Sequence, residues 1–253
     1  MFYKKIPVQI ALSAAVMVFA GVLFSGCGVK QQIHCKKDGS GYGSVEVNLS
    51  SELQAYLKDL MLGLAGAEAS ENSSIFDVNA IELAFGRFEH LDLKKIETPG
   101  NGRLSLEYSF SDINSVFAKD ATDNMKDIIS FSTNGETKRI QVYLDNENFI
   151  HVARLAGIAG TSVYDALGPN KKHPLTEQEY TDLLIFALEE YSEGTGSIQE
   201  VIGNSNVNIN FTVEGNVLNQ RGGRLTEQGV LFSIPVTRVM TLAQPLELMV
   251  EFR

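Results

Sequence analysis

Residues 31–49, with the sequence QQIHCKKDGSGYGSVEVNL, decide how the chain folds. Residues 31–37 are strand-like, and Asp38-Gly39-Ser40-Gly41 is a turn of residues that tolerate a positive φ angle. Apolar residues alternate after the turn, at Val45, Val47 and Leu49, as they do in a half-buried strand. The glycine spacing does not match the G-x-G-x-x-G of nucleotide loops. A strand, a turn and a second strand in this order predict a β-hairpin.

The chain before this hairpin has the parts of a secretory signal peptide. Lys4 and Lys5 give a basic start, and residues 6–26 are uncharged with a mostly apolar centre. A basic start, an apolar segment and small residues before the cut are typical of such a signal. The alternative is a transmembrane helix, which needs about 20 predominantly apolar residues. Pro7 and Gln9 interrupt the run, which favours the signal.

Leu23-Phe24-Ser25-Gly26-Cys27 resembles the lipobox of bacterial lipoproteins. Phe24 stands where the stricter lipobox has Leu, a relaxed form similar to that of spirochaete lipoproteins. The resemblance implies cleavage between Gly26 and Cys27 and attachment of a lipid anchor, with palmitate or a similar acyl chain, to Cys27. We therefore expect residues 1–26 to be a cleaved signal peptide and residues 27–253 to form a single envelope domain, with an alternative sub-division near residue 145.

The net charge limits the classes of partner, and the cysteine content limits how the fold can be stabilised. Without residues 1–26 the chain keeps 19 Lys and Arg against 31 Asp and Glu, a net charge of −12. This acidity argues against nucleic acid as a partner and against broad adsorption to anionic lipid. Beyond a modified Cys27, Cys35 is alone, so no intrachain disulfide can form and the fold must depend on its core.

Hairpins separated by helices fill the rest of the chain. Asn101-Gly102 and Asn134-Gly135 are strong turn signals between alternating strands, with a bulge expected near Lys94-Lys95. Helical spacing or capping signals predict helices at 51–64, 75–86, 112–118, 145–156 and 176–191, with capping boxes at Ser51 and Thr176. Ile185 and Phe186 are expected to widen the apolar face of the last helix. Apolar and polar residues alternate again near the end of the sequence, which predicts strands at 207–213, 229–236 and 246–252 and a loop at 215–228. The pattern predicts an α+β fold in which helices pack against antiparallel, hairpin-rich sheets.

The lipobox, the immediate entry into a strand and the turn Lys37-Asp38-Gly39-Ser40-Gly41 together resemble an LppM-type lipoprotein domain. This resemblance implies an α+β domain held at a membrane. It covers about the first 25 residues after Gly26, and it brings no catalytic motif.

Candidate catalytic and metal-binding residues are scarce in the sequence. The four histidines, at positions 34, 90, 151 and 173, have no metal-ligand spacing. Glu189 and Glu190 are adjacent on a helix and point in different directions, so they do not converge as a catalytic pair. Asp145 is better explained by helix capping than by calcium binding. We expect no catalytic residue, no metal and no cofactor.

Two features remain as candidates for binding. Asn206, Asn208, Asn210 and Thr212 form a polar, uncharged strand face that can hydrogen-bond a sugar or a partner strand, the alternative being an ordinary solvated face. Lys30, Lys36 and Lys37 are candidates for membrane-proximal contacts with anionic headgroups. Their alternative role is a basic edge strand that discourages aggregation.

These observations favour a membrane-anchored, non-enzymatic envelope lipoprotein with a binding or structural role. An alternative is a lipid or glycolipid binder with an apolar groove beside the membrane, and a third is an enzyme with an unrecognised site. The signal and the lipobox place the protein in the cell envelope, lipid-anchored on the exported side, either periplasmic or at the surface. An envelope protein, a lipid or a glycolipid is the expected partner.

Overall fold

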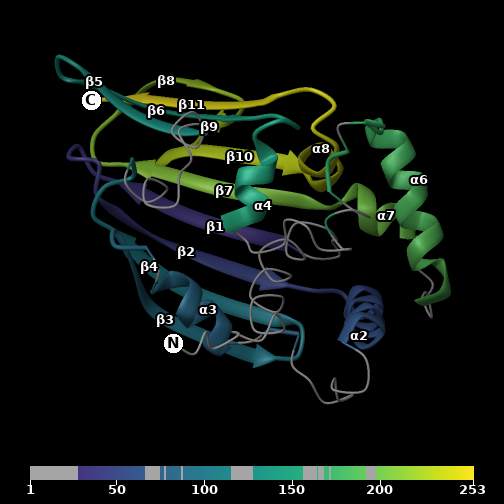
Figure 1. The fold of residues 1–253 in the computed structure, drawn as a ribbon. Helices are drawn as coiled ribbons and strands as arrows, with labels where there is room; N and C mark the ends of the chain where they lie inside the picture. Colours follow the sequence, from purple (N-terminus) through teal and green to yellow (C-terminus); the bar gives the residue numbers. More distant parts are fainter. Residues whose placement is uncertain are drawn as a thin grey trace, which may run out of the picture.

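The computed structural model describes residues 28–65, 75–76, 78–86, 88–114, 128–155, 164, 168–170, 172–191 and 198–253. Strands gather in two mostly antiparallel sheets and helices pack around them, so the α+β fold expected from the sequence is confirmed (Figure 1). The expected signal peptide and most of the helix expected at 112–118 lie outside the described residues.

In the described part of the chain the larger sheet has seven strands, in the order β3-β4-β2-β1-β7-β10-β9. Their bounds are β1 Gly28–Cys35, β2 Gly41–Asn48, β3 Leu91–Gly100, β4 Arg103–Phe110, β7 Asn206–Val213, β9 Arg224–Leu225 and β10 Gly229–Pro235. The hairpins β1–β2 and β3–β4 are those that the turns at residues 38–41 and 101–102 predict. The expected bulge is confirmed by a register shift between Leu93 and Lys95.

The pairing of β1 with β7 was not predicted. It is parallel and runs without a break from Gly28 opposite Asn206 to Cys35 opposite Val213. Because β1 pairs with β2 on its other side, it is an internal strand. The interpretation of Lys30, Lys36 and Lys37 as marks of a basic edge strand is therefore wrong.

The smaller sheet has four strands among the described residues, in the order β5-β6-β11-β8. They span Ile129–Asn134 (β5), Thr137–Leu144 (β6), Leu246–Phe252 (β11) and Val217–Arg221 (β8), all antiparallel. The loop expected at 215–228 thus contains β8 and β9. Each sheet draws strands from both sides of residue 145, so a boundary there would cut both sheets.

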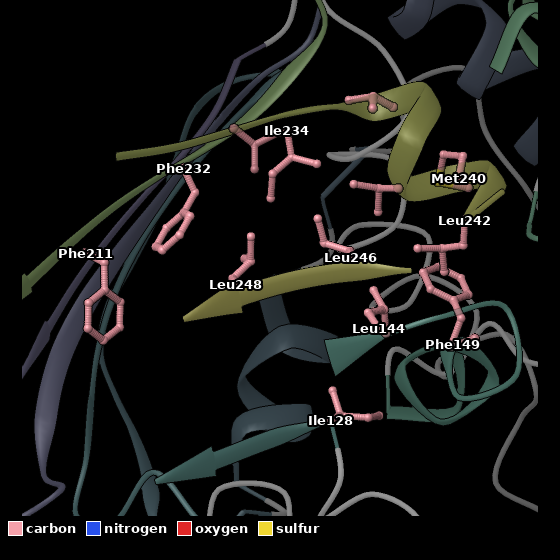
Figure 2. Close-up of a cluster of buried hydrophobic side chains, with 14 of the residues drawn as sticks. Ile128, Leu144, Phe149, Phe211, Phe232, Ile234, Met240, Leu242, Leu246 and Leu248 are labelled. Atoms are coloured by element: carbon pink, nitrogen blue, oxygen red, sulfur yellow. The ribbon is translucent and has the colours of Figure 1, made fainter. Parts of the chain in front are cut away.

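The core lies between the two sheets. Phe211, Phe232 and Ile234 of the larger sheet face Leu246 and Leu248 of β11 (Figure 2), and all five side chains are buried. The alternation of β11 explains this arrangement, since Leu246, Leu248, Val250 and Phe252 all point to one face and all are buried.

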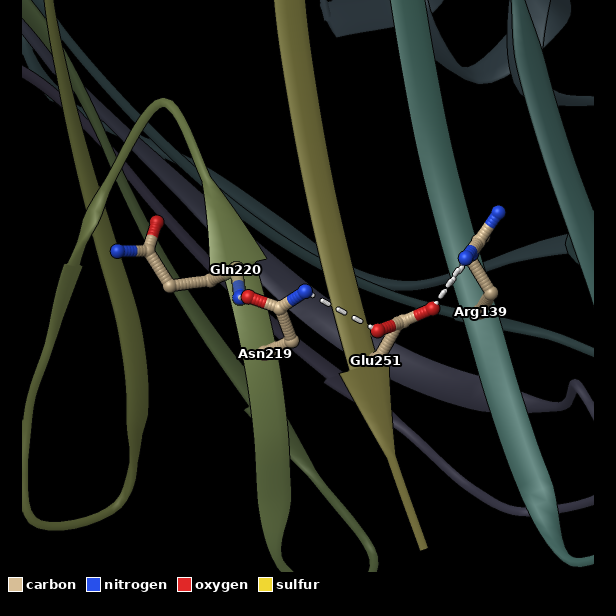
Figure 3. A network of polar contacts seen from close by, with 4 residues as sticks. All are labelled: Arg139, Asn219, Gln220 and Glu251. Atoms are coloured by element: carbon tan, nitrogen blue, oxygen red, sulfur yellow. Dashed lines mark hydrogen bonds and ion pairs between the residues drawn. The ribbon is translucent and has the colours of Figure 1, made fainter.

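The outer face of the smaller sheet is polar and held together by cross-strand pairs. Glu251 on β11 accepts hydrogen bonds from Arg139 Nε on β6 (2.8 Å) and from Asn219 Nδ2 on β8 (3.2 Å) (Figure 3). These bonds, first that of Arg139 and then that of Asn219, lower the pKa of the Glu251 carboxyl. Arg221 forms a second pair with Glu247 at 2.6 Å. The charged side chains named here are therefore already paired with one another.

The helices are α2 Ser51–Ala65, α3 Val78–Phe85, α4 Phe149–Leu155, α6 Glu177–Leu188, α7 Ile198–Gly203 and α8 Val236–Thr241. The capping box of Thr176 and Glu179 is confirmed at the start of α6. At α2 the cap is Ser50, whose hydroxyl accepts the N–H of Leu53 (3.3 Å), while the Gln54 side chain bonds to Leu49 O. The expected capping box at Ser51 is therefore wrong, since Ser50 is the cap and Leu53 cannot complete a box.

Helix α6 differs from expectation on its outer side. Tyr180, Leu184 and Leu188 are buried as its spacing predicts, and the helix packs on α7, α8 and α2. Phe186, expected to widen the apolar face, is 82% exposed. The buried face of α6 is therefore a single narrow stripe.

Edge strands of both sheets are short, irregular or capped. β9 has two residues, and β3 changes register twice along β4. At β5, the backbone N–H of Phe131 donates to Asn114 Oδ1 (2.8 Å), and Asn114 Nδ2 donates to Phe131 O (3.2 Å). The Asn114 side chain thus occupies backbone groups that a neighbouring strand would otherwise pair with.

Two glycines of β2 make room for aromatic rings. Gly41 and Gly43 pair with Phe110 and Tyr108 of β4 on the inner face of the larger sheet. A Cβ atom at Gly43 would lie 2.6 Å from both the Tyr108 hydroxyl oxygen and Gln32 O. Glycine in a strand interior often marks such a close approach.

We expect Gly43→Ala to lower the free energy of unfolding by about 1–3 kcal/mol, because the added methyl group forces Tyr108 or the backbone to move. Urea denaturation followed by circular dichroism measures the change. Gly100→Ala is the control, since nothing lies within 4 Å of its Cβ position. A Gly43→Ala variant as stable as Gly100→Ala would contradict the packing described here.

Cys35 is fully buried at the end of β1. Burial, with a smaller contribution from the nearby Asp38 carboxylate, raises the pKa of its thiol to about 12. The folded protein therefore holds the thiol proton more tightly than the unfolded chain, and this contribution to stability is lost as pH rises from about 9 toward 12.

Because the thiolate is the reactive form, native Cys35 should react with Ellman's reagent at pH 8 far more slowly than in urea. The Cys27→Ser variant leaves Cys35 as the single thiol for this measurement. A native rate equal to the denatured rate would show that the thiol is accessible and would contradict its burial.

Candidate functional site

An apolar surface remains accessible in the middle of the larger sheet's inner face. We call Val29, Ile33, Val45, Val207 and Ile209 the central strip. All five are half-buried, although they lie on the face that points to the core. The register places them on three adjacent strands, β2, β1 and β7. A half-buried apolar strip in the middle of a sheet is where an apolar ligand gains free energy on contact.

Buried elements flank the central strip on both sides. Toward β10, Phe211 and Phe232 pack under the smaller sheet. Toward β3, helix α3 contacts the sheet, and the ring of Phe85 lies 6.2 Å from that of Tyr108. The strip therefore lies between two well-packed parts of the inner face.

One polar pair lies beside the apolar side chains of the central strip. Gln31 Nε2 donates to the hydroxyl oxygen of Tyr108 at 3.0 Å. Burial raises the pKa of Tyr108, and the hydrogen bond from Gln31 partly opposes that rise. An amide and a hydroxyl beside an apolar surface can orient the polar end of a bound amphiphile.

The strip begins close to the predicted anchor. Gly26 and Cys27 lie outside the described residues, but β1 starts at Gly28, the residue after Cys27. Val29, the first member of the strip, follows at once. A surface for an apolar ligand would thus begin two residues from the predicted site of acylation.

The three lysines proposed as membrane-proximal are not brought together. All are exposed, with Lys30 near the start of β1 and Lys36 and Lys37 beyond its far end. At about 3.3 Å per strand residue, Lys30 and Lys36 lie about 20 Å apart. Headgroup contacts by all three would require β1 to lie along the bilayer surface.

The other sequence candidates are explained locally. Asp145 Oδ1 accepts the N–H groups of Glu147 (2.9 Å) and Asn148 (2.8 Å), in a turn that precedes α4. His90 Nδ1 lies 2.9 Å from Ser111 Oγ. Within the described ranges no three His, Cys, Asp or Glu side chains are grouped as metal ligands would be. Glu189 and Glu190 are exposed, in a 3₁₀ turn after α6.

The face of Asn206, Asn208, Asn210 and Thr212 lies on the opposite side of the larger sheet from the central strip. These residues alternate along β7 with Val207, Ile209 and Phe211. The sequence correctly separated the two faces, because alternation in a strand is local. It missed the central strip, since alternation shows which residues face inward but not how well they are covered.

The described helices include none with the length and hydropathy that crossing a bilayer requires. No protein-family model matches the sequence, and neither does any curated protein. Among solved structures, the chain is similar to the folded domain of LppM from Mycobacterium tuberculosis, determined by NMR, over 90% of this chain and 89% of that one. The identity is 10% and the TM-score 0.35, so the similarity carries no argument on function.

Proposed function

We propose that this protein is a lipid-anchored, non-enzymatic lipoprotein of the cell envelope that binds an apolar chain of a lipid or glycolipid on the central strip. The observation that carries the proposal is the half-buried state of Val29, Ile33, Val45, Val207 and Ile209 on the inner face of the larger sheet. A fatty acyl chain is the envelope component whose shape and apolarity match a strip along adjacent strands.

The position of the strip supports this ligand. Because β1 starts directly after Cys27, the strip would begin beside the expected lipid anchor. A lipid from the same membrane would reach Val29 without crossing a long stretch of water. The Gln31–Tyr108 pair supplies hydrogen-bonding groups for the polar end of such a ligand.

A second candidate is a protein partner in the envelope. On α6, Phe186 is 82% exposed and Leu183 is 36% exposed, three residues apart on the helix. Exposed apolar residues at this spacing are typical of a helix face that docks in an apolar groove. Asp182, Glu189 and Glu190 surround them, which favours a partner with a basic rim over an anionic bilayer.

Cys27→Ser should abolish membrane anchoring, because the lipobox resemblance makes Cys27 the acylated residue. A single acyl chain binds a membrane with only about 10⁴ M⁻¹, whereas two or more give stable anchoring. Detergent-phase partitioning and labelling with radioactive palmitate measure the change. Unchanged partitioning and labelling in the variant would contradict the anchor at Cys27.

The binding of cis-parinaric acid tests the central strip, using the chain from Gly28 to Arg253, which contains every described strand. We expect Val45→Trp to raise the Kd by about tenfold, because the larger side chain fills the strip. Leu218→Trp is the control, since Leu218 is 50% exposed on β8.

Equal affinities in the two variants, or no binding by the unmodified chain, would contradict the lipid proposal. Lipids extracted from the purified protein and identified by mass spectrometry give an independent measurement. Absence of any lipid there, together with no binding of the probe, would leave the protein-partner candidate.

A further inference from the structure

The outer face of the larger sheet carries polar side chains on three adjacent strands, β7, β1 and β2. Lys30, Gln32, Tyr42 and Glu46 on it are exposed. The register sets Thr212, His34 and Tyr42 side by side across β7, β1 and β2, and Asn210, Gln32 and Ser44 side by side in the next row. Asn208 follows on β7. We call these seven side chains, from Gln32 to Thr212, the outer platform.

Tyr42 has an exposed aromatic ring that stacks on the side chain of His34. Its side chain is 56% exposed, and its ring stacks on His34 with centroids 4.9 Å apart and planes at 27°. His34 Nδ1 lies 3.0 Å from Thr212 Oγ1. The Thr212 hydroxyl donates to Ile33 O at 3.2 Å, so Nδ1 is the donor to Thr212 Oγ1. One face of the Tyr42 ring is thus preorganised for a ligand.

Three side-chain amides lie on the same face of the sheet as this ring. For Gln32, Asn208 and Asn210, the described part of the chain provides no hydrogen-bond partner for the side-chain amide. Each amide offers two donors and one acceptor. Asn is unfavourable in strands, yet the internal strand β7 carries it at 206, 208 and 210. These amides are therefore available to hydrogen-bond a ligand.

The lack of charged side chains on the outer platform indicates which class of ligand fits it. None of its seven side chains carries a formal charge when His34 is neutral, although the chain as a whole has a net charge of −10. At its border Lys30 faces Glu46 across β1 and β2, so these opposite charges offset each other. An uncharged ligand with many hydroxyl groups fits this surface better than a phosphate or carboxylate polymer.

We propose that the outer platform binds an uncharged polysaccharide chain. A sugar ring stacks its C–H face on Tyr42, and hydroxyl groups of neighbouring sugars bond to Gln32, Asn210 and Asn208. Tyr42 on β2 and Asn210 on β7 lie two strands apart, about 10 Å across the sheet, so the site spans more than one sugar. The platform lies on the opposite face from the central strip, and its binding does not depend on the lipid proposal.

Titration calorimetry with neutral hexasaccharides tests the platform. The full chain is used in a detergent without a sugar headgroup, with cellohexaose, maltohexaose and N-acetyl-chitohexaose as probes. We expect at least one to bind, and Tyr42→Ala to weaken that binding about tenfold. Tyr42→Phe keeps the ring and should stay close to the unmodified protein, which separates a stacking role from a loss of fold.

Leu218→Ala, at the register shift of β8 in the smaller sheet, is the matched control and should not change the affinity. Asn210→Ala should weaken binding less than Tyr42→Ala does. No binding of any hexasaccharide at millimolar concentration would overturn the proposal, as would equal binding by Tyr42→Ala. Self-association of the unmodified chain that Tyr42→Ala abolishes, without sugar binding, would assign the face to a second copy instead and would also overturn it.

Discussion

The parallel ladder between β1 and β7 is the interaction on which the rest of the structure depends. It joins β3-β4-β2-β1, from the first half of the chain, to β7-β10-β9 from the second half. Without it the larger sheet would separate into two parts. The second part packs against the smaller sheet through Phe211 and Phe232 (Figure 2). The long connection adds little to the cost of closure, because loop entropy grows only with the logarithm of length.

The internal position of β1 also brings both proposed sites onto one strand. Alternate side chains of a strand point to opposite faces. Val29 and Ile33 therefore contribute to the central strip, while Gln32 and His34 contribute to the outer platform. A strand bonded on both sides is among the least mobile parts of a sheet. Both surfaces thus rest on a rigid support.

Local features could be predicted from the sequence and non-local ones could not. The turns at Asn101-Gly102 and Asn134-Gly135 and the capping box at Thr176 need only neighbouring residues. The β1–β7 pairing joins residues far apart in the chain, and nothing in either strand marks its partner. Helix α8 was missed because it is rich in β-branched residues and ends at Leu242 with a φ of 42°, where glycine is usual.

The same distinction applies to the candidate sites. The polar face of β7 was visible in the sequence because alternation is local, whereas the half-buried state of Val45 and Ile209 depends on what the other elements leave uncovered. Phe186 is exposed because it lies on the far side of α6 from Leu184 and Leu188, and the sequence does not show how wide the packed face of a helix is. Acylation of Cys27 stays a prediction from the lipobox.

The Asn114 side chain, which bonds to the edge of β5, bears on how the molecule behaves at high density. If copies are held on a membrane, they meet in two dimensions and collide repeatedly in similar orientations. An open strand edge would then recruit the next copy and start a growing sheet. By occupying the N–H and C=O of Phe131, Asn114 removes the bonds that such growth would use first. One side-chain amide thus helps a crowded population to remain separate molecules.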